Sequence, residues 1–274
     1  MKRWLTTVLV FGICSAVVRA DITVVQMATI EGGVAAMAAP GATNSSKLTM
    51  RVKGLKSRTD MELDSTGNAS AITDIVAKQV IVLKHGEKTA QTVDLGTPAS
   101  PGPELTLKAD VSAPVATGKS QVIDGLKCDE FTFSTTMSMV EVIGAQLPPE
   151  AVEAMKGLSV VMKTSMWVTK DAPGAAEYSA YYKALGKTDL AAAALKASGV
   201  NVPGLDKLMK ALTGVDGLNY LTVMDMALEG TGPMADMMRQ MMSGMKITTK
   251  VTSITADAIG EDQFKIPEGY TVVK

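Results

Sequence analysis

The sequence predicts an α+β fold with one antiparallel sheet, and three observations carry this prediction. Hydrophobic and polar residues alternate with a period of two in about ten segments, most of them joined by short turns. Helical patterns interrupt the series in three places, all in the second half of the chain. The chain has 274 residues, 46% of them hydrophobic, and no repeat or shift in composition marks a second domain. We therefore expect a single domain with a sizeable core.

Residues 1–20 are typical of a secretory signal peptide. Lys2 and Arg3 form a charged start, and an apolar stretch follows over residues 4–18. The small residues that a signal peptidase requires come directly before Asp21. We predict cleavage between Ala20 and Asp21, so that residues 21–274 form the mature domain and are exported to the periplasm.

Two other interpretations of this segment fit less well. A membrane anchor takes roughly 20 apolar residues, more than residues 4–18 provide. Lipid attachment at Cys14 needs a small residue before the cysteine, where the chain has the bulky Ile13. Because no other segment is long and apolar enough to cross a bilayer, we expect no stable transmembrane anchor.

Cleavage would also change the charge and the cysteine count. It removes three of the 27 basic residues and none of the 28 acidic ones, which leaves a net charge of −4. A balanced, mildly acidic chain lacks the concentrated basic face that nucleic-acid binding needs. Cleavage also removes Cys14, so Cys128 stands alone and no internal disulfide can form.

The predicted strands are justified by period-two alternation, which buries one face of each strand and leaves the other in water. In residues 128–139, for example, Phe131 and Phe133 share one face, while Thr132 and Ser134 take the other. The predicted strands cover residues 21–30, 48–53, 60–64, 71–75, 79–83, 122–123, 128–139, 160–169, 218–228 and 246–256.

Three segments carry helical signals. Residues 148–158 begin with Pro148, Pro149 and Glu150, a normal helix start. Residues 174–212 favour two or three short helices, interrupted where glycines cluster. Residues 233–243 form the third helical segment.

The third helix carries the most distinctive pattern in the chain, a stripe of methionines. Six of the 19 methionines recur at i, i+3, i+4, i+7, i+8 and i+11, which places them on one helical face. They are Met234, Met237, Met238, Met241, Met242 and Met245. This stripe has three interpretations: a core-facing surface, an adaptable lid over an apolar ligand, or a thioether site for Cu(I). The last lacks a histidine to accompany the sulfur atoms, so we predict no metal site.

The sequence offers little for catalysis. It contains one histidine, His85, which we expect to be a solvated residue in a hairpin turn. Cys128 lies in a predicted strand beside Asp129, a position typical of a small buried residue rather than of a nucleophile. Phosphate-binding loops, nucleophile elbows and zinc-protease motifs are absent from the sequence. We therefore predict a non-enzymatic protein without a cofactor.

Several short motifs resemble, in order and spacing, an uncharacterised domain family of exported bacterial proteins. A basic strand with a glycine turn is followed by an I-x-D motif and an apolar run; later come I-x-G-x-K-C-x-x-[YF], x-W-V-x-K-D and F-x-[VI]-P-x-G-[YF] motifs. The matching segments are residues 53–61, 72–74, 80–83, 123–131, 166–171 and 264–270, which together span most of the mature chain.

This family is similar in layout to the LolA/LolB-like lipoprotein-carrier superfamily. The resemblance implies a curved antiparallel sheet of about ten strands, an unclosed barrel, with helices packed on its concave face. It also implies a hydrophobic cargo, since characterised members carry acyl chains or other apolar ligands across the periplasm. We therefore expect a lipid or acylated ligand under the methionine-rich helix. The alternative is a structural or protein-interaction module of the cell envelope, whose own helices fill the concave face.

Overall fold

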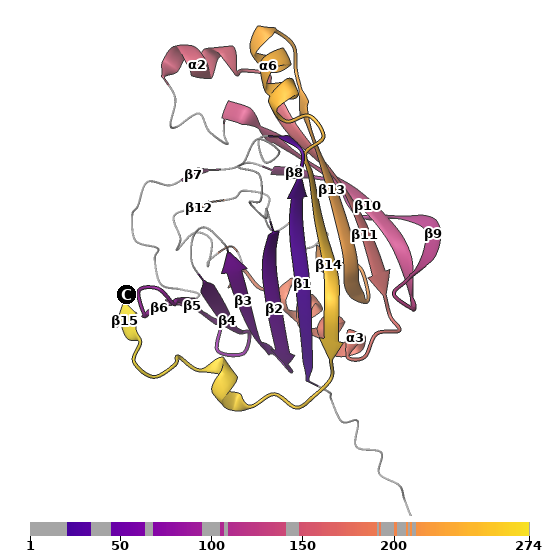
Figure 1. Cartoon of the computed structure of the whole chain (residues 1–274). Helices are drawn as coiled ribbons and strands as arrows, with labels where there is room; N and C mark the ends of the chain where they lie inside the picture. The colour runs from indigo at the N-terminus through magenta and orange to yellow at the C-terminus, as the bar shows by residue number, and fades with distance from the viewer. Residues whose placement is uncertain are drawn as a thin grey trace, which may run out of the picture.

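The computed structural model describes residues 21–33, 45–63, 68–94, 105–106, 109–140, 148–190, 192, 200–201, 207, 209 and 212–273. One large sheet dominates these residues (Figure 1). Its strands in chain order are β1 (Ile22–Glu31), β2 (Ser45–Lys53), β3 (Lys56–Leu63), β4 (Ala69–Asp74), β5 (Gln79–Lys84), β6 (Thr89–Asp94), β8 (Ala109–Val111), β9 (Val115–Ile123), β10 (Leu126–Ser138), β11 (Ser159–Thr169), β13 (Leu218–Glu229), β14 (Lys246–Thr255) and β15 (Thr271–Val273).

In space the strands follow the order β15-β6-β5-β4-β3-β2-β1-β14-β13-β11-β10-β8, with β9 also paired to β10. Neighbouring strands are antiparallel except for the parallel pair of β15 and β6. Strands β15 and β8 at the two ends of this order are not paired with each other, so the sheet is curved but unclosed. The predicted α+β class and unclosed sheet therefore agree with the structure of the described residues.

The predicted number of about ten strands was too low, because the described part of the sheet has thirteen. Strands β6, β8 and β15 were missed, and only the last two residues of β9 were predicted. Strands β8 and β15 have three residues each, too short to display a periodic pattern. In β9 the residues are exposed on both faces over almost the whole length, so alternation is absent there. A separate parallel pair, β7 (Leu105–Thr106) with β12 (Val200–Asn201), was also not predicted.

The connections of the antiparallel strands determine where the helices lie. Helix α2 (Pro149–Ala154) joins β10 to β11, and α6 (Pro233–Met241) joins β13 to β14. Because each of these pairs of strands is antiparallel, the connection that carries the helix starts and finishes at one end of the sheet. Helices α2 and α6 are found at the same end (Figure 1), where Met155, directly after α2, and Ala235 of α6 share one apolar cluster. Helix α3 (Ala175–Leu185) joins β11 to β13 from the opposite end.

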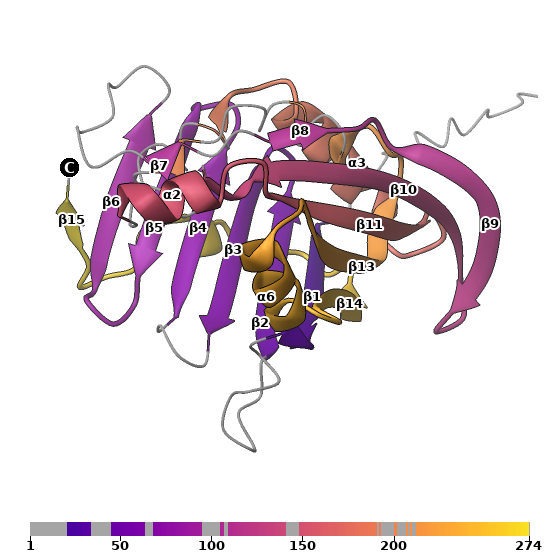
Figure 2. The ribbon, with the colours of Figure 1, turned by 90° about the horizontal axis from the view of Figure 1, so that it is seen from above.

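Helix α3 is the helix that packs against the middle of the sheet. The resemblance implied that helices in general would cover the concave face, whereas α2 and α6 lie at the end of the strands. Four aromatic or small side chains of the α3 region, Ala172, Ala175, Tyr178 and Tyr181, are buried in the largest apolar cluster. The strand residues of this cluster are Ile22, Val24, Met50, Val52, Cys128, Leu218, Tyr220 and Val251. Figure 2 shows α3 on the other side of β11 and β13 from α6.

Candidate functional site

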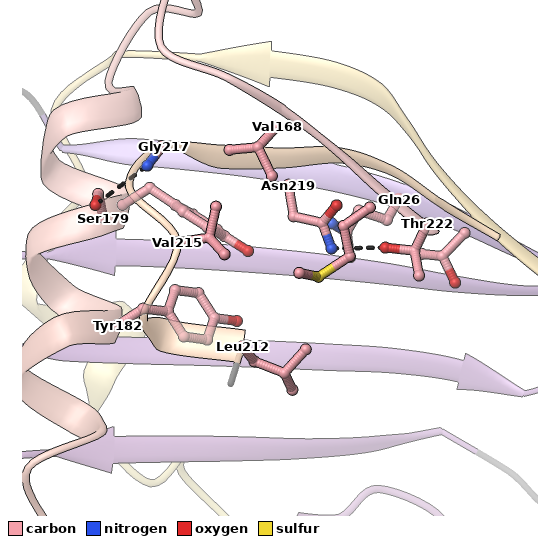
Figure 3. A pocket seen from close by; sticks show the side chains of 12 residues that line it. Gln26, Val168, Ser179, Tyr182, Leu212, Val215, Gly217, Asn219 and Thr222 are labelled. Carbon is pink, nitrogen blue, oxygen red and sulfur yellow. Dashed lines mark hydrogen bonds between the residues drawn. The ribbon is translucent and has the colours of Figure 1, made fainter. Parts of the chain in front are cut away.

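A cavity of about 260 Å³ lies between α3 and the central strands of the sheet (Figure 3). Strands β1, β11, β13 and β14 supply its wall on the sheet side, and α3 and the segment before β13 supply the other wall. The lining residues are Gln26, Met166, Val168, Tyr178, Ser179, Tyr182, Leu212, Val215, Gly217, Asn219, Thr222 and Thr249. Hydrophobic side chains, hydroxyls and amides therefore all contribute to the lining, and none of these twelve residues is acidic or basic.

The polar part of the lining follows from strand register. Thr222 on β13 lies directly opposite Met166 on β11 and Thr249 on β14, so the three residues form a row across the sheet. The register between β11 and β13 shifts after Trp167. Trp167 pairs with Leu221, but the next residue, Val168, pairs with Asn219, so Tyr220 of β13 has no partner on β11. In a regular strand, residues three apart face opposite sides. A β-bulge shifts this phase and re-aims a side chain.

The bulge brings the side chains of Asn219 and Thr222 together in the cavity wall (Figure 3). Asn219 Nδ2 donates a hydrogen bond of 2.6 Å to Thr222 Oγ1. The other polar atom of the same amide, Oδ1, is buried and has no hydrogen-bond partner. Buried amide oxygens are nearly always paired, so this unpaired oxygen marks the wall as a place where a donor is missing.

The opposite wall is aromatic and uncharged. The rings of Tyr178 and Tyr182 lie 4.6 Å apart between centroids, with a tilted arrangement. Burial raises the pKa of the Tyr182 hydroxyl, and burial together with Tyr182 raises the pKa of Tyr178 well above the usual value. Both hydroxyls therefore stay neutral at physiological pH. The Tyr182 hydroxyl also lies 3.2 Å from Met50 Sδ on β2, which fixes its ring against the sheet.

Charged groups stand beside the cavity but are already paired. Asp216 Oδ1 accepts hydrogen bonds of 2.7 Å from Lys183 Nζ and from Ser179 Oγ, and Lys170 Nζ lies 3.6 Å from Asp216 Oδ2. The bonds from Lys183 and Ser179 lower the pKa of Asp216 to about 2. This carboxylate thus engages both lysines, while Ser179 also accepts a hydrogen bond from the Gly217 amide in the wall.

The six methionines of the stripe differ in their surroundings. Met234, Met238 and Met242 pack against an apolar cluster that includes Met155, directly after α2, and Leu228 of β13. Met237 and Met241 are exposed, by 52% and 48%. Met245 is half-buried, close to Gly33 after β1. Met234, Met237, Met238 and Met241 lie on α6, whereas Met242 and Met245 follow its end, so the helix is shorter than the predicted stripe. None of the six lines the cavity beside α3. That the stripe covers a ligand stays a prediction.

Two further sequence expectations concern His85 and Cys128. His85 lies in a hairpin turn as expected, but it is half-buried rather than solvated. Its Nε2 lies 2.6 Å from Ser70 Oγ and its Nδ1 lies 2.5 Å from the Tyr270 hydroxyl. Cys128 is buried, and burial together with the charge of Asp129 raises the pKa of its thiol, as expected for an unreactive cysteine.

The signal-peptide prediction lies largely outside the described residues, which begin at Asp21, so cleavage after Ala20 stays a prediction. Asp21 itself is held at the sheet, where its carboxylate accepts a 2.7 Å hydrogen bond from the Ile259 amide. In the described part of the chain, acidic, histidine and cysteine side chains form no group of three or more that could bind a metal. No helix in that part has the length and apolar character needed to cross a membrane.

Sequence reasoning missed the cavity residues on β13 and α3. Asn219 was part of a predicted strand, but the bulge that turns it toward Thr222 has no signature in the sequence. The cluster of Tyr178, Tyr181 and Tyr182 was a usable signal, since these are three of the five tyrosines in a chain with only 4% aromatic residues. Such a concentration on one short helix indicates a buried, specialised face.

Comparisons with known proteins add little to this geometry. No protein-family model and no curated protein matches the sequence. Among solved structures, the crystal structure of LprF from Mycobacterium bovis aligns with 92% of this chain and 91% of its own chain, at 10% sequence identity and a TM-score of 0.30. No conclusion is drawn from a likeness of that degree, and the resemblance to an exported carrier-like family stays a prediction.

Proposed function

We propose that this protein is an exported, non-enzymatic binding protein that holds a lipid or another hydrophobic ligand in the cavity beside α3. The observation that carries the proposal is the cavity itself, bounded by Met166, Val168 and Val215 and by the tyrosines of α3. Ligand sites are concave and mostly apolar, with a few placed polar groups, and this lining has that composition.

The size of the cavity limits the ligand. Its volume of about 260 Å³ is slightly below the range of roughly 300–1,000 Å³ that is typical of sites for drug-sized ligands. A single acyl or alkyl chain with a small head suits this space better than a lipid with several chains. Export rests on the signal-peptide pattern of residues 1–20.

The lining supports binding rather than catalysis. A hydrolase or transferase of the common kinds needs a nucleophile paired with a general base. Among the twelve lining residues, the hydroxyls of Ser179 and Thr222 are bonded to Asp216 and to the Asn219 amide nitrogen. Neither hydroxyl has a histidine beside it, and the one histidine of the chain bonds to Ser70 and Tyr270 instead.

The experiment that tests the proposal narrows the cavity mouth. Leu212 lines the cavity and is 39% exposed, so Leu212→Trp adds bulk at the mouth without overfilling a packed core. Leu55 is a matched control, since it is 37% exposed in the turn between β2 and β3. Binding is followed with prodan, an uncharged environment-sensitive naphthalene dye, and co-purified lipid is identified by mass spectrometry.

We expect the wild type and Leu55→Trp to bind prodan alike, and Leu212→Trp to lose most of this binding while keeping its thermal unfolding temperature. Apolar material should also be extracted from the wild type but not from Leu212→Trp. Equal binding by all three proteins, or no uptake by the wild type, would contradict the proposal.

A second candidate function is an interaction module of the cell envelope, and β9 favours it. The hairpin of β9 and β10 projects from the body of the sheet (Figure 2). Val115 and Val122 of β9 are 62% and 71% exposed. Exposed edge strands with apolar residues are templates for an added strand from a partner. A photo-crosslinking residue at Val122 that captured a defined envelope protein, together with absent prodan binding, would favour this function over ligand binding.

A further inference from the structure

We infer that the cavity beside α3 selects a single-chain amphiphile whose head is uncharged and donates a hydrogen bond, such as an alcohol or a primary amide. The inference rests on the proposed function, because it names the class of ligand for the same cavity. It depends on two observations that are independent of each other. One is an unpaired buried acceptor in the cavity wall, and the other is the absence of an unpaired charge among the side chains that line and flank the cavity.

The unpaired acceptor is Asn219 Oδ1. The amide is held in place because its Nδ2 already donates to Thr222 Oγ1 at 2.6 Å. Its oxygen is buried without a partner, so the protein lacks one donor at this position. Figure 3 shows the oxygen on the side of the amide away from Thr222. A hydroxyl or an N–H group of a ligand would supply the missing donor, whereas an ether or ester oxygen would place a second acceptor against the first.

One other buried side-chain oxygen without a partner occurs in the described chain, Thr164 Oγ1. Thr164 lies on the same face of β11 as Met166, but it does not line the cavity. Thr164 therefore serves as a control for Asn219. Both residues have an unpaired buried oxygen in the paired strands β11 and β13, but only Asn219 lines the cavity.

The surroundings disfavour a charged head. The lining contains no acidic or basic side chain, and the tyrosine hydroxyls in it stay neutral because burial raises their pKa. Lys183 and Lys170, which flank this part of the cavity, are engaged by Asp216. A carboxylate, phosphate or ammonium head would enter this cavity unpaired, and an unpaired charge is far costlier to bury than a neutral hydroxyl.

The arrangement of the lining also orients the ligand. The neutral amides and hydroxyls of Gln26, Asn219, Thr222 and Thr249 come from β1, β13 and β14, while Val215 and Tyr182 stand on the wall nearer α3 (Figure 3). The head is thus expected at the strand side, next to Asn219, and the chain along Val215 and Tyr182.

The test compares three ligands of similar chain length by displacement of prodan: decanol, methyl decyl ether and decanoate at neutral pH. Decanol donates and accepts a hydrogen bond, the ether accepts without donating, and decanoate is charged. Decanol should displace prodan at a concentration about tenfold lower than either of the others, the ratio expected for one unpaired buried group. Decylammonium, a cation, should displace prodan as poorly as the anion decanoate. This result would show that a charge of either sign is disfavoured.

Asn219→Leu removes the unpaired oxygen and should abolish the preference for decanol over the ether. Thr164→Val removes the other unpaired oxygen and should leave the preference unchanged. Prodan has no hydrogen-bond donor, so the prodan bound by each variant reports that its cavity still forms, and the preference is measured as the ratio of the two displacing concentrations within one variant. Asn219→Ala provides a second variant if Asn219→Leu does not fold.

The outcomes distinguish this inference from the function on which it rests. If prodan binds and the ether or decanoate competes as well as decanol, the cavity binds ligands but the inferred head is wrong. The same holds if Asn219→Leu keeps the preference of the wild type. If neither prodan nor any of the decyl compounds binds the wild-type protein, the proposed function itself is overturned.

Discussion

The hydroxyl of Tyr181 on α3 lies 2.6 Å from Ser57 Oγ on β3, and both side chains are buried. The two residues are 124 positions apart in sequence. Burial raises the pKa of Tyr181 to about 12, so its hydroxyl is neutral at any physiological pH. This hydrogen bond joins α3 to β3, whereas the cavity lies between α3 and strands β1, β11, β13 and β14. It therefore fixes the position of the wall that carries Tyr178 and Tyr182.

We expect Tyr181→Phe to lower the free energy of unfolding by about 1–3 kcal/mol, because it leaves a buried Ser57 hydroxyl without its partner. Urea denaturation followed by circular dichroism measures this change. Adding Ser57→Ala to the first substitution should recover part of the loss, since no polar group then remains unpaired. If the losses of the two single variants simply add in the double variant, the two residues act independently, which would contradict this prediction.

A second polar network joins β2, β3, β4 and the C-terminal segment through Asp60. Ser70 Oγ donates to Asp60 Oδ1 at 2.5 Å, Arg58 Nε donates to the same oxygen at 2.7 Å, and Arg51 pairs with the other oxygen. Burial alone would raise the pKa of Asp60, but the hydrogen bonds from Ser70, Arg58 and Arg51 outweigh it, so the pKa is lowered. From Ser70 the network continues to His85 and Tyr270.

Because the folded-state pKa of Asp60 lies below its usual value of 3.8, the carboxylate stabilises the fold above that pH. This contribution is lost as the pH falls through the lowered pKa. We expect Asp60→Asn to cost about 2 kcal/mol at neutral pH and to flatten the acid limb of a plot of stability against pH.

Glu62 is the matched control on the same strand. It is 52% exposed and pairs with Lys47 at 3.0 Å, and an exposed pair contributes less than about 1 kcal/mol. Glu62→Gln should therefore leave both the stability and its pH dependence almost unchanged in the same urea titrations. Equal losses in the two variants would show that the network around Asp60 adds nothing specific.

Much of the fold followed from local patterns, because the strands of this sheet bury one face. Helices α2, α3 and α6 begin within a residue of the predicted positions, where Pro149, Gly174 and Pro233 signal a start. Strands β11 and β13 alternate so regularly that their extents were predicted almost to the residue. Strand β9 could not be predicted, since both of its faces are exposed and its pairing with β10 is set by the hairpin.

The site could be predicted less well than the fold, because it depends on contacts that no local pattern encodes. Four of the six methionines lie on α6 and two follow its end, but spacing cannot distinguish a face that meets a core from one that meets water. Asn219 reaches the cavity through a register shift between β11 and β13, which depends on the pairing of strands about 50 residues apart. His85 was predicted to be solvated because its own turn contains no partner for it. Its partners, Ser70 on β4 and Tyr270 after β14, are distant in sequence.

Gly217 is the backbone position in the cavity wall that tolerates substitution least. Its φ of +132° is accessible mainly to glycine, and an added Cβ would lie 2.7 Å from the carbonyl oxygen of Thr169. Gly232 before α6 has a φ of +111°, but an added Cβ there would meet nothing within 4 Å. Comparing Gly217→Ala with Gly232→Ala therefore separates the effect of backbone strain, present in both, from that of a steric collision, present only at Gly217.

We expect Gly232→Ala to cost about 1–2 kcal/mol from backbone strain. Gly217→Ala should cost more than this, because β11 must also move away from the new methyl group. Thermal unfolding and prodan binding together check the prediction: Gly217→Ala should weaken both, and Gly232→Ala only the first. Similar losses of stability for the two variants would mean that β11 moves away from the new methyl group without a measurable loss of free energy.

The last prediction concerns neighbouring methionines on α6. Met238 packs into the cluster with Leu158 and Leu228, whereas Met237 is 52% exposed. Met238→Ala should lower the free energy of unfolding by about 2 kcal/mol through the lost packing, and Met237→Ala should change it by less than about 0.5 kcal/mol. Urea denaturation of the two variants gives both values, and the identical substitution one position apart cancels differences in helix propensity. Comparable losses at both positions would indicate that Met237 is covered in solution, which would support a partner or ligand on the exposed face of the stripe.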